Sequence, residues 1–277
     1  MKTADVRQFW DDQANEFGAS DLATAPDHYY RLMEIDRIKS KLIDHQDVLD
    51  VGCGNGYSTI EFAKALPRST FIGVDYSAPM IAYAKAAALA ANSPAIFAEG
   101  DVRSLEQCEA ITGRRFDTII SERCLINLKD WDEQREAILS LKRLLKPTGR
   151  ILLVENTQEG LANLNKLRAQ FDLHEIKVRW HNFYIPQNEL ERFAVKNFRV
   201  ESVENIGNLY YILSRVLYAK LAQIEGKEPQ YDHVINEIAS ELPSLPLYQF
   251  SPNFIYVLRN NGIPTAASEP KEHSVFD

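Results

Sequence analysis

Apolar and polar positions alternate along the first 156 residues in a rhythm of short apolar runs and longer amphipathic runs. Short runs rich in branched and aromatic residues predict strands, and longer runs with helical spacing of apolar residues predict helices. Strands separated by helices form a parallel sheet that is covered on both faces. The expected strands are Val48–Val51, Thr70–Val74, Ala95–Ala98, Phe116–Ser121 and Arg150–Glu155, and the expected helices are Tyr57–Leu66, Pro79–Ala91 and Trp131–Leu145.

The rhythm loosens after Asn156, where the pattern predicts more helices than strands. We expect helices at Pro186–Val195, Leu209–Glu225 and Tyr231–Leu242, and strands at Phe198–Val203 and Phe254–Leu258. No internal repeat or low-complexity linker divides the chain. It is therefore expected to form one domain over residues 1–260, followed by a tail, 261–277, whose composition is typical of disorder.

Composition narrows the classes of partner. With 45% hydrophobic residues and a formal net charge of −8, the chain lacks the basic excess that nucleic acid or an anionic membrane surface would attract. Its three cysteines show no C-x-x-C spacing, and no apolar run approaches the length of a membrane span. We expect a cytoplasmic protein without a membrane span, a nucleic-acid partner or a bound metal.

The stretch VLDVGCGNGYS, residues 48–58, puts Gly52, Gly54 and Gly56 directly after the first strand. A dinucleotide fingerprint would continue as G-x-G-x-x-G, but Tyr57 stands where the third glycine belongs. No Gly-Lys-Ser/Thr follows, which excludes a P-loop. The alternative is a plain strand-to-helix turn, which would account for only one or two of the glycines.

Acidic residues stand at the ends of successive predicted strands. Asp50 can organise the glycine turn or accept from an amine, and Asp75 can accept both hydroxyls of a ribose or cap the next helix. Asp101 can accept from an adenine amino group beside the Val102 backbone, although alone it reads as a turn residue. Several acids at one sheet edge favour a cationic ligand over a pyrophosphate.

Five elements in this order resemble the class I S-adenosylmethionine-dependent methyltransferases: VLDVGCGNG, GVDYS, EGDV, FDTIIS and LLKPTGRILLVE. The resemblance covers residues 48–155 and implies a Rossmann-like α/β fold with a seven-stranded, mostly parallel sheet, helices on both faces and an antiparallel last strand. It implies an N-terminal helical lid, 1–45, a cofactor core, 46–156, and substrate-side elaborations, 157–250, with a helical insertion before the last strand.

The same resemblance assigns the cofactor, S-adenosylmethionine, which leaves as S-adenosylhomocysteine. The glycines would approach its methionine part, Asp75 would bind the ribose, and Tyr76 and Met80 would lie against the adenine. The family places acceptor chemistry after the fourth strand, where this chain has SERCLINL and lacks the Asp/Asn-Pro-Pro-Tyr/Phe signature of DNA and protein-amide methyltransferases.

Polar residues after the fourth and fifth strands are therefore candidates for acceptor binding. Glu122, Arg123 and Asn127 follow the fourth strand, and Glu155 and Asn156 end the fifth. A surface Glu–Arg pair is the alternative for the first two. Glu122 and Glu155 are also candidate bases.

The segment KVRWHNFY, residues 177–184, adds Arg179, His181 and Asn182. An isolated histidine is more often structural, but a neutral imidazole at His181 can take a hydroxyl proton, with an apparent pKa expected near ~6–7. Arg179 and Asn182 are expected to bind the acceptor.

These residues predict methyl transfer to a hydroxyl of a small molecule or glycan. The tract from SERCLINL to KVRWHNFY is similar to bacterial methyltransferases of surface-polysaccharide or secondary-metabolite pathways. N-methylation and a non-catalytic regulatory protein that binds S-adenosylmethionine remain open alternatives, and an oxidoreductase is disfavoured by Tyr57. The sequence leaves monomer and homodimer open.

Overall fold

The computed structural model describes residues 3–242 and 250–261 of the 277-residue chain. A seven-stranded sheet runs through it in the order β3-β2-β1-β4-β5-β7-β6. All neighbouring pairs are parallel except those of β7, which is antiparallel to β5 and β6. This confirms the predicted Rossmann-like α/β fold. The strands are β1 Asp47–Val51, β2 Thr70–Asp75, β3 Ile96–Glu99, β4 Phe116–Glu122, β5 Leu145–Asn156, β6 Phe198–Asn205 and β7 Asn253–Asn260.

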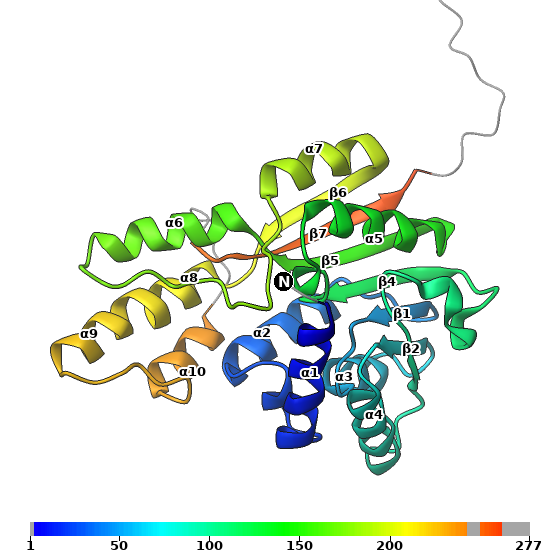
Figure 1. Ribbon diagram of the computed structural model, residues 1–277, viewed down its shortest axis with the longest axis horizontal. Helices are drawn as coiled ribbons and strands as arrows, with labels where there is room; N and C mark the ends of the chain where they lie inside the picture. The colour runs from blue at the N-terminus through cyan, green and yellow to red at the C-terminus, as the bar shows by residue number, and fades with distance from the viewer. Residues whose placement is uncertain (1–2, 243–249, 262–277) are drawn as a thin grey trace, which may run out of the picture.

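Helices cover both faces of this sheet, as Figure 1 shows. Within the described residues, none has the length and apolar content that a membrane span requires. The helices are α1 Thr3–Phe17, α2 His28–Lys39, α3 Tyr57–Ala65, α4 Ala78–Ala90, α5 Trp131–Arg143, α6 Gln158–Ala169, α7 Gln187–Asn197, α8 Asn208–Tyr211, α9 Tyr218–Ile224 and α10 Val234–Glu241.

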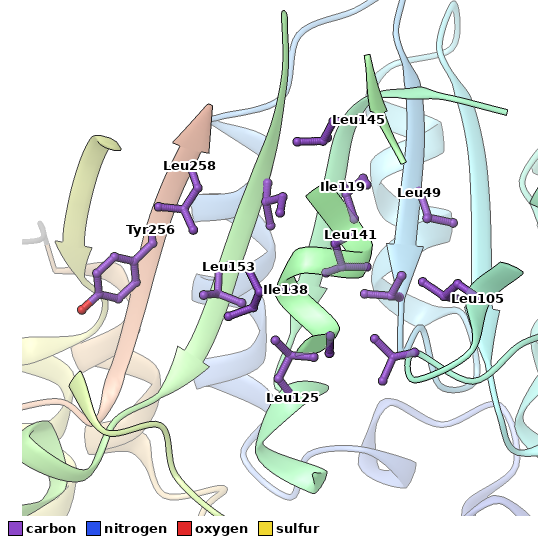
Figure 2. Close-up of a cluster of buried hydrophobic side chains, with 14 of the residues drawn as sticks. Leu49, Leu105, Ile119, Leu125, Ile138, Leu141, Leu145, Leu153, Tyr256 and Leu258 are labelled. Carbon is purple, nitrogen blue, oxygen red and sulfur yellow. The ribbon is translucent and has the colours of Figure 1, made fainter. Parts of the chain in front are cut away.

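Alternate residues of the strands enter two separate cores, because successive side chains of a strand point to opposite faces. Leu49 and Leu153 belong to the core beneath α5 and α7, and Val48 and Leu152 to the core beneath α2 and α3. Figure 2 shows Ile138 of α5 in the first of these cores, beside the strand that carries Leu153. The middle of the sheet is thereby buried on both sides, which is why β1, β2, β4 and β7 consist mainly of buried residues.

The pattern missed helix α6. Its sequence, QEGLANLNKLRA, holds a glycine in the first turn and few apolar residues. Thr157 caps the helix by accepting from the Gly160 amide at 3.2 Å. A Cβ at Gly160 would lie 2.6 Å from the Ser251 carbonyl oxygen, so the chain needs a glycine here for close packing. Tertiary contact outweighs the poor helix propensity of glycine.

Two predicted helices differ in detail. The helix expected over Trp131–Leu145 ends at Arg143, and Leu145 already pairs with Phe116 as the first residue of β5. The helix expected over Leu209–Glu225 is α8 and α9 joined by a π-helical segment, Ile212–Leu217. A π-helical turn leaves no mark on the apolar period of so short a segment, so the sequence did not reveal it.

The carboxyl ends of β1, β2 and β4 meet at one edge of the sheet, where α1 and α2 pack over them (Figure 1). α1 packs against α4 through Ala14 and Met80. Beyond this edge, α6 and the π-helical segment pack together around Leu164 and Val216. The predicted disordered tail lies outside the described residues from position 262 on.

Candidate functional site

The glycine turn between β1 and α3 is built from left-handed backbone. Gly52, Gly54 and Gly56 have φ angles of 70°, 54° and 78°, which residues with a side chain rarely adopt. The Gly52 amide donates to the Val74 carbonyl at 2.8 Å, which ties the turn to β2. A Cβ at Gly52 would lie 2.5 Å from the sulfur of Cys124. The turn therefore needs all its glycines for backbone shape and for close approach by neighbouring residues.

Asp75 joins two turns at the sheet edge. One carboxylate oxygen accepts from the Gly54 amide and the other from the Ser77 amide, both at 2.9 Å. Ser77 in turn caps α4 by accepting from the Met80 amide. Burial raises the pKa of Asp75 to about 6. Each oxygen keeps a further lone pair, so the bonds to the backbone leave capacity for a ligand.

Asp50 and Asp101 already have partners within the protein. Asp50 accepts from the Thr59 hydroxyl at 2.5 Å, and its burial raises its pKa to about 7. Asp101 accepts from the Arg103 amide at 2.9 Å and forms an ion pair with the same side chain, which lowers the pKa of Asp101. Asp50 thus holds α3 onto the strand, and the Asp101 carboxylate is shared with Arg103.

One cavity of about 450 Å³ brings most of the predicted residues together. Its lining includes residues of the glycine turn, α1, α6 and α9. A volume of ~300–1,000 Å³ is typical of small-molecule sites. The predicted residues that line it are Asp50, Gly52, Gly54, Asp75, Tyr76, Met80, Asp101, Val102, Glu122, Arg123, Asn127, Asn156, Arg179, His181 and Asn182.

Glu155, a predicted base, does not line this cavity. It is 1% exposed, and its carboxylate accepts from the Ser121 hydroxyl at 2.7 Å and from three amides of the loop after β4. Burial raises its pKa to about 7. The Glu155 carboxylate thus holds the loop after β4 in place. Its expected position on the acceptor side is corrected, because the side chain points to this loop and not into the cavity.

Arg123 lies in a buried cluster of charges. Its backbone has a φ of 52°, uncommon for a residue with a side chain, and its amide donates to the Val154 carbonyl. A guanidinium nitrogen lies 3.3 Å from Glu34 and 3.5 Å from Glu122. Burial raises the pKa of Glu34 to about 8. The predicted Glu122–Arg123 pair exists, but it lies against the buried face of α2 and not on a solvated surface.

Glu34 was not predicted to belong to the site, although its spacing within α2 is a usable signal. Glu34 stands four residues after Tyr30 and four before Ile38, both buried, so it shares the inner face of α2. Arg168 and Arg215, which also line the cavity, were missed as well: helix α6 was not predicted, and the helix predicted over Leu209–Glu225 gave no indication that Arg215 lines a cavity. The helical spacing of buried residues in α2 would have revealed Glu34, whereas nothing in the local sequence marks Arg168 or Arg215.

Asn127 lines the cavity, but its side chain is hydrogen-bonded to other residues of the protein. Its carbonyl oxygen accepts from the Trp10 indole at 3.0 Å, and its amide donates to the Arg123 carbonyl at 3.0 Å. These bonds hold α1 against the loop after β4. Asn127 therefore positions the covering helix, and its predicted contact with an acceptor would need a bond beyond these.

His181 is 3% exposed and surrounded by aromatic rings. Its ring stacks on Phe9 with a centroid distance of 4.2 Å and meets Trp10 edge-on at 5.5 Å. Burial and the charge of Arg179 lower its pKa to about 4. This pKa lies below the expected ~6–7, because the ring is desolvated and lies near a cation.

Several buried polar atoms at this end of the cavity lack a hydrogen-bond partner among the described residues. They are Oε1 of Glu122, Oδ1 of Asn156, Nδ1 of His181 and Oδ1 of Asn182. Unpaired buried polar atoms are costly and are normally satisfied by water or by a ligand. Across the described part of the chain, no cluster of three or more His, Cys, Asp or Glu residues is placed to hold a metal ion.

Residues 48–149 match the model of a family described as "Methyltransferase domain". A probable methyltransferase of Aspergillus luteorubrus, ltbC, is 36% identical over 118 residues, which is 40% of this chain and 40% of that protein. The malonyl-[acyl-carrier protein] O-methyltransferase of Halalkalibacterium halodurans is 29% identical over 38% of this chain and 37% of that one. The matched region thus spans less than half the length of these relatives.

Solved structures extend the likeness to nearly the whole fold. Magnesium protoporphyrin IX methyltransferase of Synechocystis PCC 6803, with bound SAH, has a TM-score of 0.59 and 16% identity over 94% of this chain and 100% of that one. N-methyltransferase NodS of Bradyrhizobium japonicum WM9, in complex with S-adenosyl-l-homocysteine, has a TM-score of 0.54 and 15% identity over 91% and 98%. At such identities the likeness concerns the fold.

The bonds of Glu155 lead to a stability prediction. Replacing it with Ala leaves three buried amides and a hydroxyl without their acceptor, so the free energy of unfolding should fall by about 3 kcal/mol or more. Glu155→Gln, which keeps one acceptor oxygen, should cost much less. Denaturant unfolding measures the free energy of unfolding of both variants. Glu189→Gln, at an exposed position of α7, is the control.

The raised pKa of Glu155 adds a pH dependence. The neutral acid is favoured in the folded state, so the stability it contributes is complete below its ordinary pKa of 4.5 and is lost as pH rises through about 7. Glu155→Gln removes this group from the titration. Between pH 4.5 and about 7, the unfolding free energy of Glu155→Gln should therefore fall less than that of the wild type. The same dependence on pH in both proteins would show that Glu155 does not titrate in this range.

Proposed function

We propose, from the class I S-adenosylmethionine-dependent methyltransferase domain that the chain carries, that the protein transfers a methyl group to a hydroxyl of a small polar acceptor. A sugar, a polysaccharide unit or a secondary metabolite is the class of acceptor that we favour. The observation that carries this proposal is a single cavity lined both by the glycine turn and by buried polar atoms that have no hydrogen-bond partner among the described residues.

The chemistry of the glycine end fits S-adenosylmethionine, the cofactor of this family. Asp50, Asp75 and Asp101 supply negative charge at the strand ends, which suits a sulfonium cation and opposes a pyrophosphate. Asp75 would hold the ribose, and the Tyr76 hydroxyl, buried without a partner among the described residues, leaves a group for the adenosine. The bound cofactor supplies the methyl group and a good leaving group.

The protein's own contribution is alignment and exclusion of water. α1 covers the cavity and is fixed to the loop after β4 through Trp10 and Asn127. Asn156 and Asn182 present buried oxygens without a hydrogen-bond partner among the described residues, and the Glu122 oxygen makes only an ion contact with Arg123, so all three can accept from the hydroxyls of an acceptor. Holding two reactants in line in this way can lower a barrier by ~7–11 kcal/mol.

His181 is the group that we place beside the reacting hydroxyl. With a pKa of about 4, its imidazole is neutral throughout the physiological range and its free Nδ1 can accept a hydrogen bond. So weak a base does not remove an alcohol proton in advance. It accepts the proton as the oxygen becomes more acidic on methylation, and Glu122, which also lines the cavity, is the second group that we consider for this role.

N-methylation is the second candidate, because a neutral amine needs no base before attack. The relatives do not separate the two: the Halalkalibacterium protein is named an O-methyltransferase and NodS an N-methyltransferase. A regulatory protein that binds the cofactor without turnover has no need of the unpaired polar set around His181. That set favours an enzyme.

Replacing Asp75 with Ala tests the cofactor end. The variant loses the bonds to the ribose, so the dissociation constant for S-adenosylhomocysteine should rise by a factor that corresponds to roughly 2–4 kcal/mol. Its Tm should also fall, because the Gly54 and Ser77 amides lose their acceptor. Calorimetry on the folded variant measures the affinity for S-adenosylhomocysteine. Asp36→Ala, at an exposed position of α2, is the control.

The wild type should bind S-adenosylhomocysteine in preference to NAD. Affinity should also increase as pH rises through about 6, since the ionised Asp75 is the better acceptor. Unchanged affinity in a folded Asp75→Ala protein would place the ribose elsewhere.

A variant of His181 tests the acceptor end. His181→Ala should lower turnover by about 100-fold and leave the affinity for S-adenosylhomocysteine unchanged, as for the loss of a positioned proton acceptor. His174→Ala, on the same loop and exposed, is the matched control.

The pH profile gives an independent readout. The pKa of His181 is lowered to about 4, so its ring should not titrate between pH ~6 and ~7. Any change of the reaction rate with pH in that range should therefore be the same in the wild type and in His181→Ala. A limb in that range that vanishes with the imidazole would show that the ring titrates at its ordinary pKa. Full activity in both His181→Ala and Glu122→Gln would turn the proposal toward an amine acceptor.

A further inference from the structure

Charge is distributed unevenly along the cavity. Near the glycine turn, acidic side chains outnumber basic ones in the described lining, with Arg103 paired to Asp101. At the opposite end the described lining is basic: Arg168 of α6, Lys177 and Arg179 of the following loop, and Arg215 of the π-helical segment. Opposite ends of one cavity therefore attract opposite charges.

The basic end has little acid to neutralise it. Arg215 pairs with Asp27, but Arg168, Lys177 and Arg179 have no carboxylate within 4.0 Å among the described residues. Arg168 instead donates to the carbonyl oxygens of His174 and Arg215. Burial and, to a smaller extent, the nearby charge of Arg215 lower the pKa of Arg168.

Arg168 and Arg215 are held by the fold and are not loose surface groups. The bonds of Arg168 join α6, the following loop and the π-helical segment. The guanidinium of Arg215 lies over the Tyr231 ring at 4.7 Å and over the Tyr211 ring at 5.6 Å. π-helical turns often occur at functional sites, and this one directs Ser214 and Arg215 to the cavity.

We propose that Arg168, Lys177, Arg179 and Arg215 bind an anionic group of the methyl acceptor, a carboxylate or a phosphate, at the end of the cavity remote from the cofactor. The inference rests on the proposed methyltransferase function and narrows its acceptor to an acid that also carries the methylated hydroxyl. Arg guanidinium groups suit both anions, because their N–H groups match two oxygens at once. Tyr184, Tyr211 and Tyr231 give the same end an aromatic lining.

Calorimetry on the full chain saturated with S-adenosylhomocysteine tests this with pairs of probes that differ in charge. Benzoate is compared with benzamide, and phenyl phosphate with phenol. At least one anion should bind about tenfold tighter than its neutral partner, the scale of one charge-assisted bond. The anion that binds tighter identifies the acceptor as a carboxylate or a phosphate.

Charge-removing variants locate the anion. Lys177 and Arg179 are exposed and make no side-chain bond in the described part of the chain, so Lys177→Gln/Arg179→Gln should fold. Its dissociation constant for the preferred anion should rise about three- to tenfold, while those for the neutral partner and for S-adenosylhomocysteine stay unchanged. Lys166→Gln, exposed on α6 and outside the cavity lining, is the matched control.

Arg168→Gln and Arg168→Lys separate charge from structure. Both lose the bonds to the carbonyl oxygens of His174 and Arg215, but only the Lys variant keeps the charge, so it should bind the anion tighter than the Gln variant. Equal binding of charged and neutral probes, no binding of either anion, or an equal loss in Lys166→Gln would overturn the proposal. Failure of S-adenosylhomocysteine to bind would instead refute the proposed function itself.

Discussion

The bonds of the Asp75 carboxylate to two backbone amides are the interaction on which the site depends. One bond reaches the glycine turn after β1 and the other reaches the turn before α4, so a single side chain sets the spacing of two neighbouring strand ends. The left-handed glycines give the first turn its shape, and Asp75 fixes where that turn lies. A ligand of Asp75 therefore binds to a group that the fold has already oriented.

Some polar side chains around this edge hold the structure together, and others have atoms that are available to a ligand. Glu155 and Asn127 use their hydrogen bonds on the loop after β4 and on α1, which leaves that loop and that helix fixed above the cavity. Glu122 and His181 each keep a buried atom at the cavity that makes no hydrogen bond within the described residues. The fixed groups determine where an acceptor can lie, and the unpaired ones are available to contact it.

Periodic patterns predicted the individual strands and most helices, and the glycine motif predicted the turn, because each depends on residues close together in the chain. The antiparallel direction of the last strand depends on distant pairing and was implied only by the family resemblance. The patterns could not assign Glu155 or the pKa of His181, since both depend on contacts made by folding: the amides around Glu155, and the Phe9 ring and Arg179 beside His181. Helix α6 was missed because its glycine is favoured by packing against Ser251 and not by local propensity.

A crystal structure with S-adenosylhomocysteine bound tests the central claim most directly. The account predicts the ribose hydroxyls at the Asp75 carboxylate, the amino acid part along Gly52 and Gly54, and the sulfur facing the end of the cavity that holds Glu122 and His181. A ligand whose ribose lies away from Asp75, or whose sulfur faces away from those unpaired atoms, would contradict it.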